Sequence, residues 1–265
     1  MAHDTTTRES AVQEGKLLPE SAANIEATLA AASTPVAGEA VADLEQAGAW
    51  AELNDRFYRT LAFGTGGIRG RTVGKIVTTA ERGTPNSLGR PEFPCVGTNA
   101  MNYDSVIRAT RGLVEYLHDW FAREKISGTP KLVIAHDTRF FSKEFTKLAG
   151  EVAAKNGCDA CVFDGPRSTP ELSFAVRYLR ANAGVVITAS HNPAHDNGYK
   201  VYFDDGAQVI EPHASGIIAK VNAPPEPPNG KRGRVTTLNR DVDEAYLQRL
   251  ETLVLDPELV RAQSD

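Results

Sequence analysis

Residues 131–188 read KLVIAHDTRFFSKEFTKLAGEVAAKNGCDACVFDGPRSTPELSFAVRYLRANAGVVIT, and the order of patterns in this stretch decides the fold. Three short apolar runs, at 131–136, 160–163 and 184–188, are typical of strands that are covered on both faces. The two segments between them carry apolar residues at helical spacing. This alternation predicts a parallel sheet with right-handed crossovers, whose ligands bind at the carboxyl ends of the strands.

Two of these three strands are followed by residues suited to chemistry. His136–Arg139 follow the first strand, and the sequence Thr-Ala-Ser-His-Asn-Pro at 188–193 follows the third. Ser190 leaves a buried strand, so its hydroxyl is held at the edge of the sheet. A serine hydrolase of the Gly-x-Ser-x-Gly type is disfavoured because both glycines are missing. His191 and Lys200 would stabilise a phosphate ester better than an acyl enzyme, while a plain hydrogen-bonded turn is the structural alternative.

The rest of the chain divides by composition and periodicity. Residues 1–21 are polar and aperiodic, residues 223–230 contain four prolines, and a strand is expected at Arg234–Asn239 beyond them. The expected divisions are a flexible tail (1–21), a helical preface (22–60), an α/β domain (61–222), a Pro-rich linker (223–233) and the start of a second domain (234–265).

Composition disfavours several classes of partner. The formal net charge of -5 argues against binding to nucleic acid or to an anionic membrane surface. No apolar stretch approaches the roughly 18 residues of a membrane span, and the first residues do not form a signal peptide. Three cysteines are an odd and sparse set that favours a reducing compartment. We therefore expect a cytoplasmic protein, and the sequence leaves its oligomeric state open.

Four ordered elements together resemble the alpha-D-phosphohexomutase family, the phosphoglucomutases and phosphomannomutases. They are Phe-Gly-Thr-Gly-Gly-Ile-Arg-Gly at 63–70, Thr-Ala-Ser-His-Asn-Pro at 188–193, Asn-Gly-Tyr-Lys at 197–200 and Gly-Ala-Gln at 206–208. The resemblance covers about residues 50–222 and continues more weakly to 265. It implies a three-layer α/β/α domain with a mostly parallel mixed sheet, plus the start of a second α/β domain.

The resemblance also implies a site. Ser190 matches the family's phosphorylated serine, which gives its phosphoryl group to a sugar monophosphate and regains one from the bisphosphate intermediate. His191 and Lys200 match residues assigned to proton transfer and phosphate stabilisation. The implied cofactors are Mg²⁺, bound in part through the phosphate on Ser190, and a sugar bisphosphate; the implied substrate is a phosphosugar. The implied phosphate- and substrate-binding residues are Thr65, Arg69, Asn192 and Arg139.

One departure from the family limits this expectation. The family's metal-binding Asp-Gly-Asp-x-Asp run does not occur in these 265 residues, so the other metal ligands are expected beyond Asp265. Asp204 and Asp205 are adjacent on a strand turn and point apart, which disfavours a metal site there. We expect the N-terminal portion of a phosphosugar mutase, acting on sugar 1- and 6-phosphates or pentose 1- and 5-phosphates and inactive alone. The alternative is a non-catalytic phosphosugar-binding or regulatory module, and the preferred sugar stays open.

Other polar residues have a structural interpretation beside the functional one. Asp137 and Arg139 either orient the phosphate or form a strand-end clamp, and the sequence does not separate these roles. His195 is expected to be a solvated loop residue. Cys158 and Cys161 lack a second pair or a histidine at zinc spacing, so we expect buried structural thiols.

Overall fold

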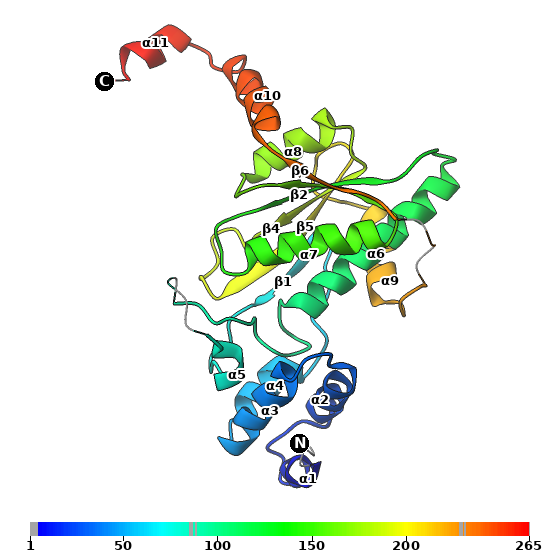
Figure 1. The fold of residues 1–265 in the computed structure, drawn as a ribbon, viewed down its shortest axis with the longest axis vertical. Helices are drawn as coiled ribbons and strands as arrows, with labels where there is room; N and C mark the ends of the chain where they lie inside the picture. The colour runs from blue at the N-terminus through cyan, green and yellow to red at the C-terminus, as the bar shows by residue number, and fades with distance from the viewer. Residues whose placement is uncertain (1–4, 85–86, 88, 228–229, 231, 265) are drawn as a thin grey trace.

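The computed structural model describes residues 5–84, 87, 89–227, 230 and 232–264. Within them, six strands form one sheet in the order β1-β5-β4-β2-β3-β6 (Figure 1). The strands are β1 (Gly67–Arg71), β2 (Lys131–His136), β3 (Asp159–Phe163), β4 (Ala183–Ile187), β5 (Asp196–Phe203) and β6 (Val235–Leu238). β4, β2, β3 and β6 are parallel, whereas β5 is antiparallel to both of its neighbours. The predicted α/β fold with a mostly parallel mixed sheet is confirmed.

Helices cover both faces of the sheet and give three layers (Figure 1). One apolar face of the sheet is covered by α6 (Tyr103–Arg123), α7 (Ser142–Lys155) and α9 (His213–Asn222). Tyr199 of β5 is fully buried in the core on this face. α8 (Thr169–Tyr178) covers the other face, and α10 (Arg240–Glu251) packs on α8. None of the described helices combines the length and the apolar character needed to cross a membrane.

The chain ahead of the sheet forms a helical unit with a core of its own. Its helices are α1 (Thr5–Gln13), α2 (Pro19–Ala31), α3 (Val36–Gln46) and α4 (Trp50–Phe57), and the short α5 (Thr79–Arg82) touches α3. The prediction of a flexible tail over 1–21 is wrong from residue 5 onward, and residues 1–4 lie outside the described part. Ala11 and Leu17 enter this core, and buried Arg8 pairs with Glu45 at 2.7 Å. These few anchors are too widely spaced to show a periodic pattern.

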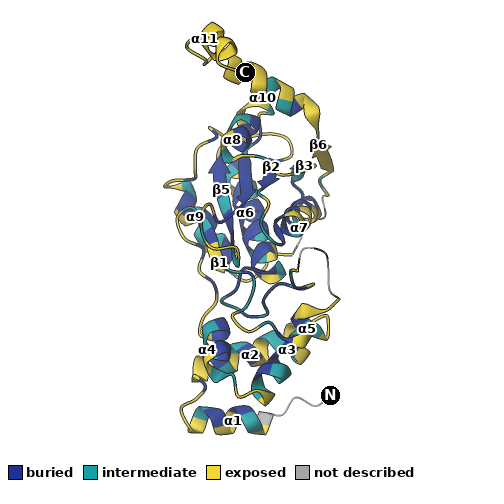
Figure 2. Cartoon of the chain, turned by 90° about the vertical axis from the view of Figure 1, so that its left-hand side faces the viewer, coloured by how far each residue is buried: buried dark blue, intermediate teal, exposed yellow. Residues whose placement is uncertain are grey.

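β6 corrects the expected domain boundary. It pairs in parallel with β3, with Thr236 opposite Cys161, so the strand after the Pro-rich segment completes the first sheet instead of opening a separate domain. Residues 228, 229 and 231 of the predicted linker lie outside the described part. α11 (Pro257–Ala262) has no buried residue and projects from the molecule, as Figure 2 shows. A second domain beyond β6 stays a prediction.

Candidate active site

The Ser190 loop leaves the sheet at the carboxyl end of β4. Ser190 has φ +57, in the left-handed region that residues with a side chain seldom adopt, and its side chain is exposed. Its backbone N–H donates to Thr188 Oγ1 at 2.9 Å, which fixes this turn. The Ser190 Oγ lies 3.3 Å from His191 Nδ1, and no carboxylate among the described residues contacts His191. A Ser–His–acid hydrolase arrangement is therefore not formed.

Arg139 holds the Ser190 loop. Its Nε lies 3.2 Å from Asp137 Oδ2. A guanidinium has five N–H groups, and the remaining four are on the terminal nitrogens. These donate to four backbone oxygens of the loop, those of Ser190 (2.8 Å), Asn192 (2.6 Å), Pro193 (2.8 Å) and Asp196 (3.1 Å). These contacts favour the clamp for Arg139, and its phosphate-binding role stays a prediction.

Asp137 joins the ends of two strands and the start of a helix. Its carboxylate accepts from Thr188 Oγ1 at 2.5 Å and from Ser142 Oγ at 2.9 Å. It also accepts from the Arg139 backbone N–H at 2.9 Å. Because Thr188 in turn accepts from Ser190, a chain of hydrogen bonds runs from β2 to the serine. Of the two roles considered for Asp137, these contacts favour the clamp.

The β1–β5 pairing brings Arg69 to the Ser190 loop. Arg69 lies opposite Gly198, and its Nη1 donates to Asn192 Oδ1 at 3.4 Å. Asn192 Nδ2 donates to Asp196 Oδ2 at 3.1 Å, so its amide is fixed from both sides. Two segments more than 100 residues apart in the chain thus meet beside Ser190.

Lys200 and Thr65 lie farther back along the sheet. Lys200 in β5 is opposite Gly67 in β1 and Val186 in β4. Val186 stands four residues before Ser190 in the sequence. The Lys200 ammonium makes no hydrogen bond or ion pair with the described residues. Thr65 occupies a tight turn closed by Gly64 and Gly67, whose N–H and C=O groups exchange hydrogen bonds of 2.8 and 3.0 Å. No hydrogen bond between described residues joins Thr65 to the Ser190 loop.

A cavity of about 430 Å³ opens beside Ser190 at the ends of β2 and β4. Asp137 and Arg139 form part of its wall. Thr138, which belongs to the 136–139 segment singled out from the sequence, also lines it. Sequence reasoning missed Phe140 and Ala194, the other lining residues, although Phe140 directly follows that segment. Ser190, an exposed residue, therefore lines a space that a small ligand can enter.

The described residues do not form a magnesium site. Among them, no group of three or more His, Cys, Asp or Glu side chains is placed to hold a metal ion. Asp204 and Asp205 follow the end of β5 that pairs with Ala183, at the opposite end of β4 from Ser190. Asp205 Oδ1 accepts from the Ala207 N–H at 2.8 Å. Ser190 is thus the single oxygen donor of the expected metal set, which does not fit Mg²⁺ by itself.

The cysteines are not arranged for chemistry. Cys95 and Cys158 are buried and Cys161 is half-buried, and all three are free thiols. Burial raises the pKa of the Cys95 thiol to about 12 and raises the pKa values of Cys158 and Cys161 above their ordinary value. A protonated thiol is a poor nucleophile and a poor metal ligand. These environments fit the expected structural role of Cys158 and Cys161.

Two histidines outside the Ser190 motif, His195 and His118, make ordinary contacts. The side chain of His195 is 41% exposed, and its Nε2 lies 3.6 Å from Asp196 Oδ1. His118 is half-buried on α6, with Nε2 2.9 Å from the Asn156 carbonyl oxygen. Neither contacts Ser190 in the described structure.

Comparison with known proteins relates this geometry to a family. The family model "Phosphoglucomutase/phosphomannomutase, alpha/beta/alpha domain I" matches residues 95–227. A phosphoglucomutase of Staphylococcus saprophyticus is 32% identical over 212 residues, which are 77% of this chain and 33% of that protein. The Saccharomyces cerevisiae phosphoribomutase is 34% identical over 181 residues, 67% of this chain and 25% of that protein. The chain thus spans a third or less of the length of these curated relatives.

A solved structure agrees with the sequence comparison. A crystal structure of a provisionally assigned phosphomannomutase from Thermus thermophilus is similar, with a TM-score of 0.55 and 27% sequence identity. The match covers 74% of this chain and 36% of that chain. The sheet and the Ser190 edge described above therefore belong to a fold found in known proteins.

Proposed function

Because the chain belongs to the phosphoglucomutase/phosphomannomutase family, we propose that Ser190 is the phosphoryl carrier of a phosphosugar mutase. The substrates are sugar 1- and 6-phosphates or pentose 1- and 5-phosphates. The observation that carries the proposal is the clamped Ser190 loop, which holds an exposed hydroxyl beside a cavity of about 430 Å³. The free thiols favour a reducing compartment, and we place the protein in the cytoplasm.

The reaction exchanges one phosphorus–oxygen bond for another. In the first half, the bond between phosphorus and Ser190 Oγ breaks while a sugar hydroxyl forms a new bond to phosphorus and gives its proton to a base. Ser190 Oγ takes up a proton as it leaves phosphorus. In the second half, Ser190 Oγ gives up that proton and bonds to the phosphorus of the other phosphate, while the bond between that phosphorus and the sugar oxygen breaks and the sugar oxygen takes up a proton. Catalysis of such a transfer consists mostly of positioning and charge neutralisation.

The chain's own residues supply both contributions. The loop clamp fixes the serine oxygen, and the Arg69 guanidinium lies next to the loop through Asn192. His191, whose Nδ1 is 3.3 Å from the serine oxygen, and Lys200 are the groups proposed to move the proton and stabilise the phosphate. Mg²⁺ and a sugar bisphosphate are the cofactors implied by the family resemblance. Since the described residues do not form a metal site, the steps above are assigned to the chain's own residues and not to Mg²⁺.

Replacing the serine tests the proposal directly. Ser190→Ala in the protein as its source organism makes it removes the atom that carries phosphate. We expect mutase activity, measured with a catalytic amount of sugar bisphosphate, to fall by at least about a thousandfold. Ser264→Ala, an exposed serine far from the site, serves as the matched control. Activity that survives Ser190→Ala would contradict the phosphoserine mechanism and favour another nucleophile, whereas absence of activity in the unchanged protein would favour the non-catalytic module.

Lys200→Met separates a chemical from a structural role of the lysine. Loss of a group that assists proton transfer slows phosphoryl transfer by about 10²–10⁴-fold. The free energy of unfolding should change by no more than about 1 kcal/mol, because the Lys200 ammonium has no partner among the described residues. Rapid-quench measurement of transfer and urea unfolding give the two quantities, with Lys147→Met, 80% exposed, as the control. A large loss of stability with an equal loss of rate would make Lys200 structural.

A further inference from the structure

A second cavity lies at the same edge of the sheet, beyond β5 from Ser190. It has a volume of about 270 Å³ and opens where β1 ends, between α4 and the segment around residue 100. Five of its lining residues are cationic and two are acidic. The cationic residues are Arg56, Arg59, Arg69, Arg71 and Lys75, and the acidic residues are Asp55 and Asp196. Of these residues, the family resemblance assigns a role only to Arg69.

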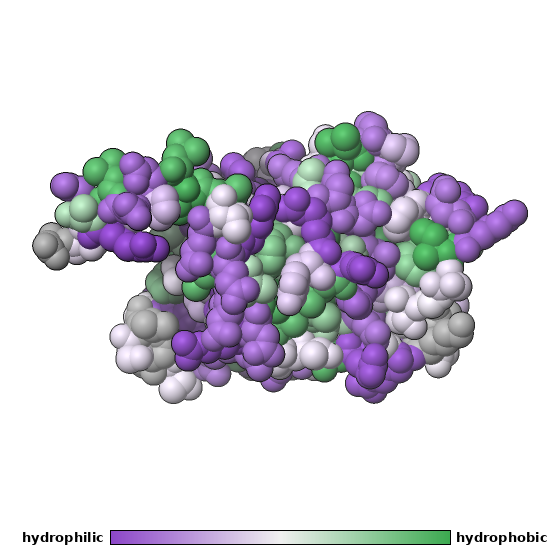
Figure 3. All heavy atoms as spheres, turned by 90° about the horizontal axis from the view of Figure 1, so that it is seen from above, coloured by the Kyte–Doolittle hydropathy of each residue, from purple (hydrophilic) through white to green (hydrophobic). Residues whose placement is uncertain are grey.

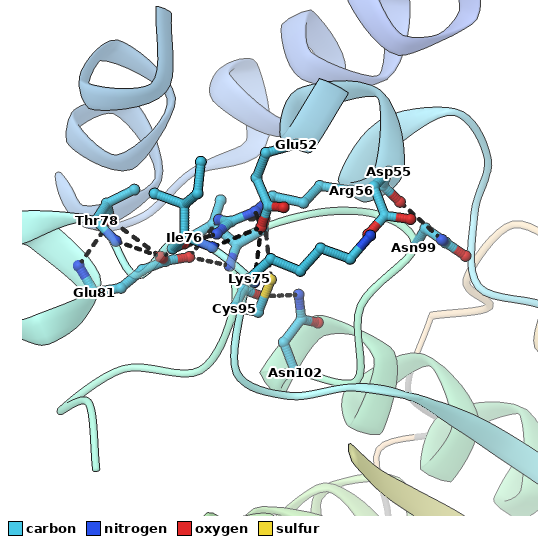
Figure 4. A network of polar contacts seen from close by, with 11 residues as sticks. Glu52, Asp55, Arg56, Lys75, Ile76, Thr78, Glu81, Cys95, Asn99 and Asn102 are labelled. Atoms are coloured by element: carbon cyan, nitrogen blue, oxygen red, sulfur yellow. Dashed lines mark hydrogen bonds and ion pairs between the residues drawn. The ribbon is translucent and has the colours of Figure 1, made fainter. Parts of the chain in front are cut away.

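Arg56 forms a neutralised wall of the cavity. Its guanidinium is 2% exposed and lies between two carboxylates, with Nε 2.8 Å from Glu52 Oε1 and Nη1 2.6 Å from Glu81 Oε1. Figure 4 shows this network, with Lys75 extending beside Arg56 toward Asp55 and with Asn99 beyond. Lys75 Nζ is 3.0 Å from Asp55 Oδ2. The positive charges of Arg56 and Lys75 are therefore neutralised by ion pairs within the protein.

The guanidinium groups of Arg59, Arg69 and Arg71 form no ion pair with a carboxylate of the described residues. Arg59 Nε donates to the Asn99 amide oxygen at 3.2 Å, and Arg69 Nη1 donates to the Asn192 amide oxygen at 3.4 Å. Arg71 is half-buried, and its side chain has no hydrogen bond or ion pair with the described residues. Both acidic residues of the wall are engaged elsewhere, Asp55 with Lys75 and Asp196 with Asn192. Three like charges around one small space repel each other unless an anion enters it.

We propose that this cavity binds the phosphate group of a small molecule, with Arg59 and Arg71 as its distinguishing residues and Arg69 shared with the Ser190 edge. Guanidinium groups suit phosphate because their planar N–H groups match its oxygens in pairs. The volume of about 270 Å³ lies below the roughly 300–1,000 Å³ of sites for drug-sized ligands. It fits inorganic phosphate or the phosphate end of a phosphate ester, and it is too small for a nucleotide.

The site is separate from the phosphoryl carrier. Ser190 lines the cavity of about 430 Å³, and no described residue lines both cavities. Arg69 and Asn192 form the contact between them. A phosphate in the second cavity thus lies near Ser190 without entering the cavity that Ser190 lines. The inference does not depend on the proposed function.

The test is a titration of the isotopically labelled protein with inorganic phosphate, followed by glucose 1-phosphate, monitored by NMR. We expect saturable shifts of the backbone amides of Gly70, Asn99 and Ala100, which line the cavity. The double variant Arg59→Gln/Arg71→Gln should weaken binding at these reporters by at least about tenfold, because two charge-assisted contacts are lost. Ser190→Ala should bind as the unchanged protein does.

Controls keep the outcome decisive. Arg240→Gln removes an exposed arginine, 86% accessible, far from the cavity, and should leave binding unchanged. If the double variant fails to fold, Arg59→Gln alone, at an exposed position, should still weaken binding severalfold. Equal affinity for the two probes identifies a free-phosphate site, and tighter binding of glucose 1-phosphate identifies a phosphate-ester site. Shifts confined to the Ser190 loop, or unchanged affinity in these variants, would overturn the proposal.

Discussion

At the scale of single residues, Arg139 holds the backbone of the Ser190 loop through its two terminal nitrogens. The contacts that decide this role lie 51 to 57 residues away in the chain, on backbone oxygens of the Ser190 loop. The sequence shows the neighbouring Asp137 but not these oxygens, so it left a clamp and a phosphate ligand as equal interpretations. Ser190, His191 and Asn192 were predictable because one strand end carries all three.

Replacing Arg139 tests the clamp. Arg139→Met removes the guanidinium donors to four backbone oxygens of the loop, and we expect amide hydrogen exchange in residues 190–196 to accelerate by at least about tenfold. The free energy of unfolding should fall by about 1–3 kcal/mol, since hydrogen bonds to a charged group are lost. Arg139→Lys should restore only part of both, because a single ammonium does not span four oxygens. Loop exchange that stays unchanged in Arg139→Met would contradict the assignment.

At the scale of elements, the antiparallel pairing of β1 with β5 positions the glycine-rich segment. β1 reads Gly-Ile-Arg-Gly-Arg and contains one apolar side chain, so no hydrophobic pattern reveals it as a strand. The three core strands were predictable from their apolar runs, and β6 was predictable as a strand but not as a member of this sheet. Its first three residues are exposed, and pairing with β3 depends on backbone hydrogen bonds that composition does not show.

Gly67→Ala tests how tightly this pairing is specified. Gly67 has φ +131, and an added Cβ would lie 1.8 Å from the Tyr199 carbonyl oxygen in β5. We expect a loss of about 2–5 kcal/mol in the free energy of unfolding, from backbone strain and from displacement of β1. Gly128→Ala is the matched control, since Gly128 also has positive φ (+102) but nothing within 4 Å. It should cost only about 1 kcal/mol in urea unfolding. Equal losses at the two positions would contradict a close β1–β5 contact.

At the scale of the whole molecule, the chain has a packed centre and an exposed carboxyl-terminal arm. Leu253, Leu255, Leu259 and Val260 are 57%, 102%, 57% and 60% exposed. Figure 3 shows hydrophobic side chains on this arm, at the left of the view. The opposite end consists of α1–α4 around their own apolar core (Figure 2). The sequence predicted the helices of 22–60 from their apolar composition but not α1, whose packing rests on a few isolated anchors.

The central claim is that Ser190 carries a phosphoryl group, and peptide mass spectrometry tests it most directly. Trypsin should release residues 181–200, which contain both Thr188 and Ser190, from protein purified from its source and incubated with a sugar bisphosphate. We predict one phosphoryl group on this peptide, located on Ser190 by fragmentation. An active preparation in which Ser190 is unmodified, or in which Thr188 carries the group instead, would contradict the account.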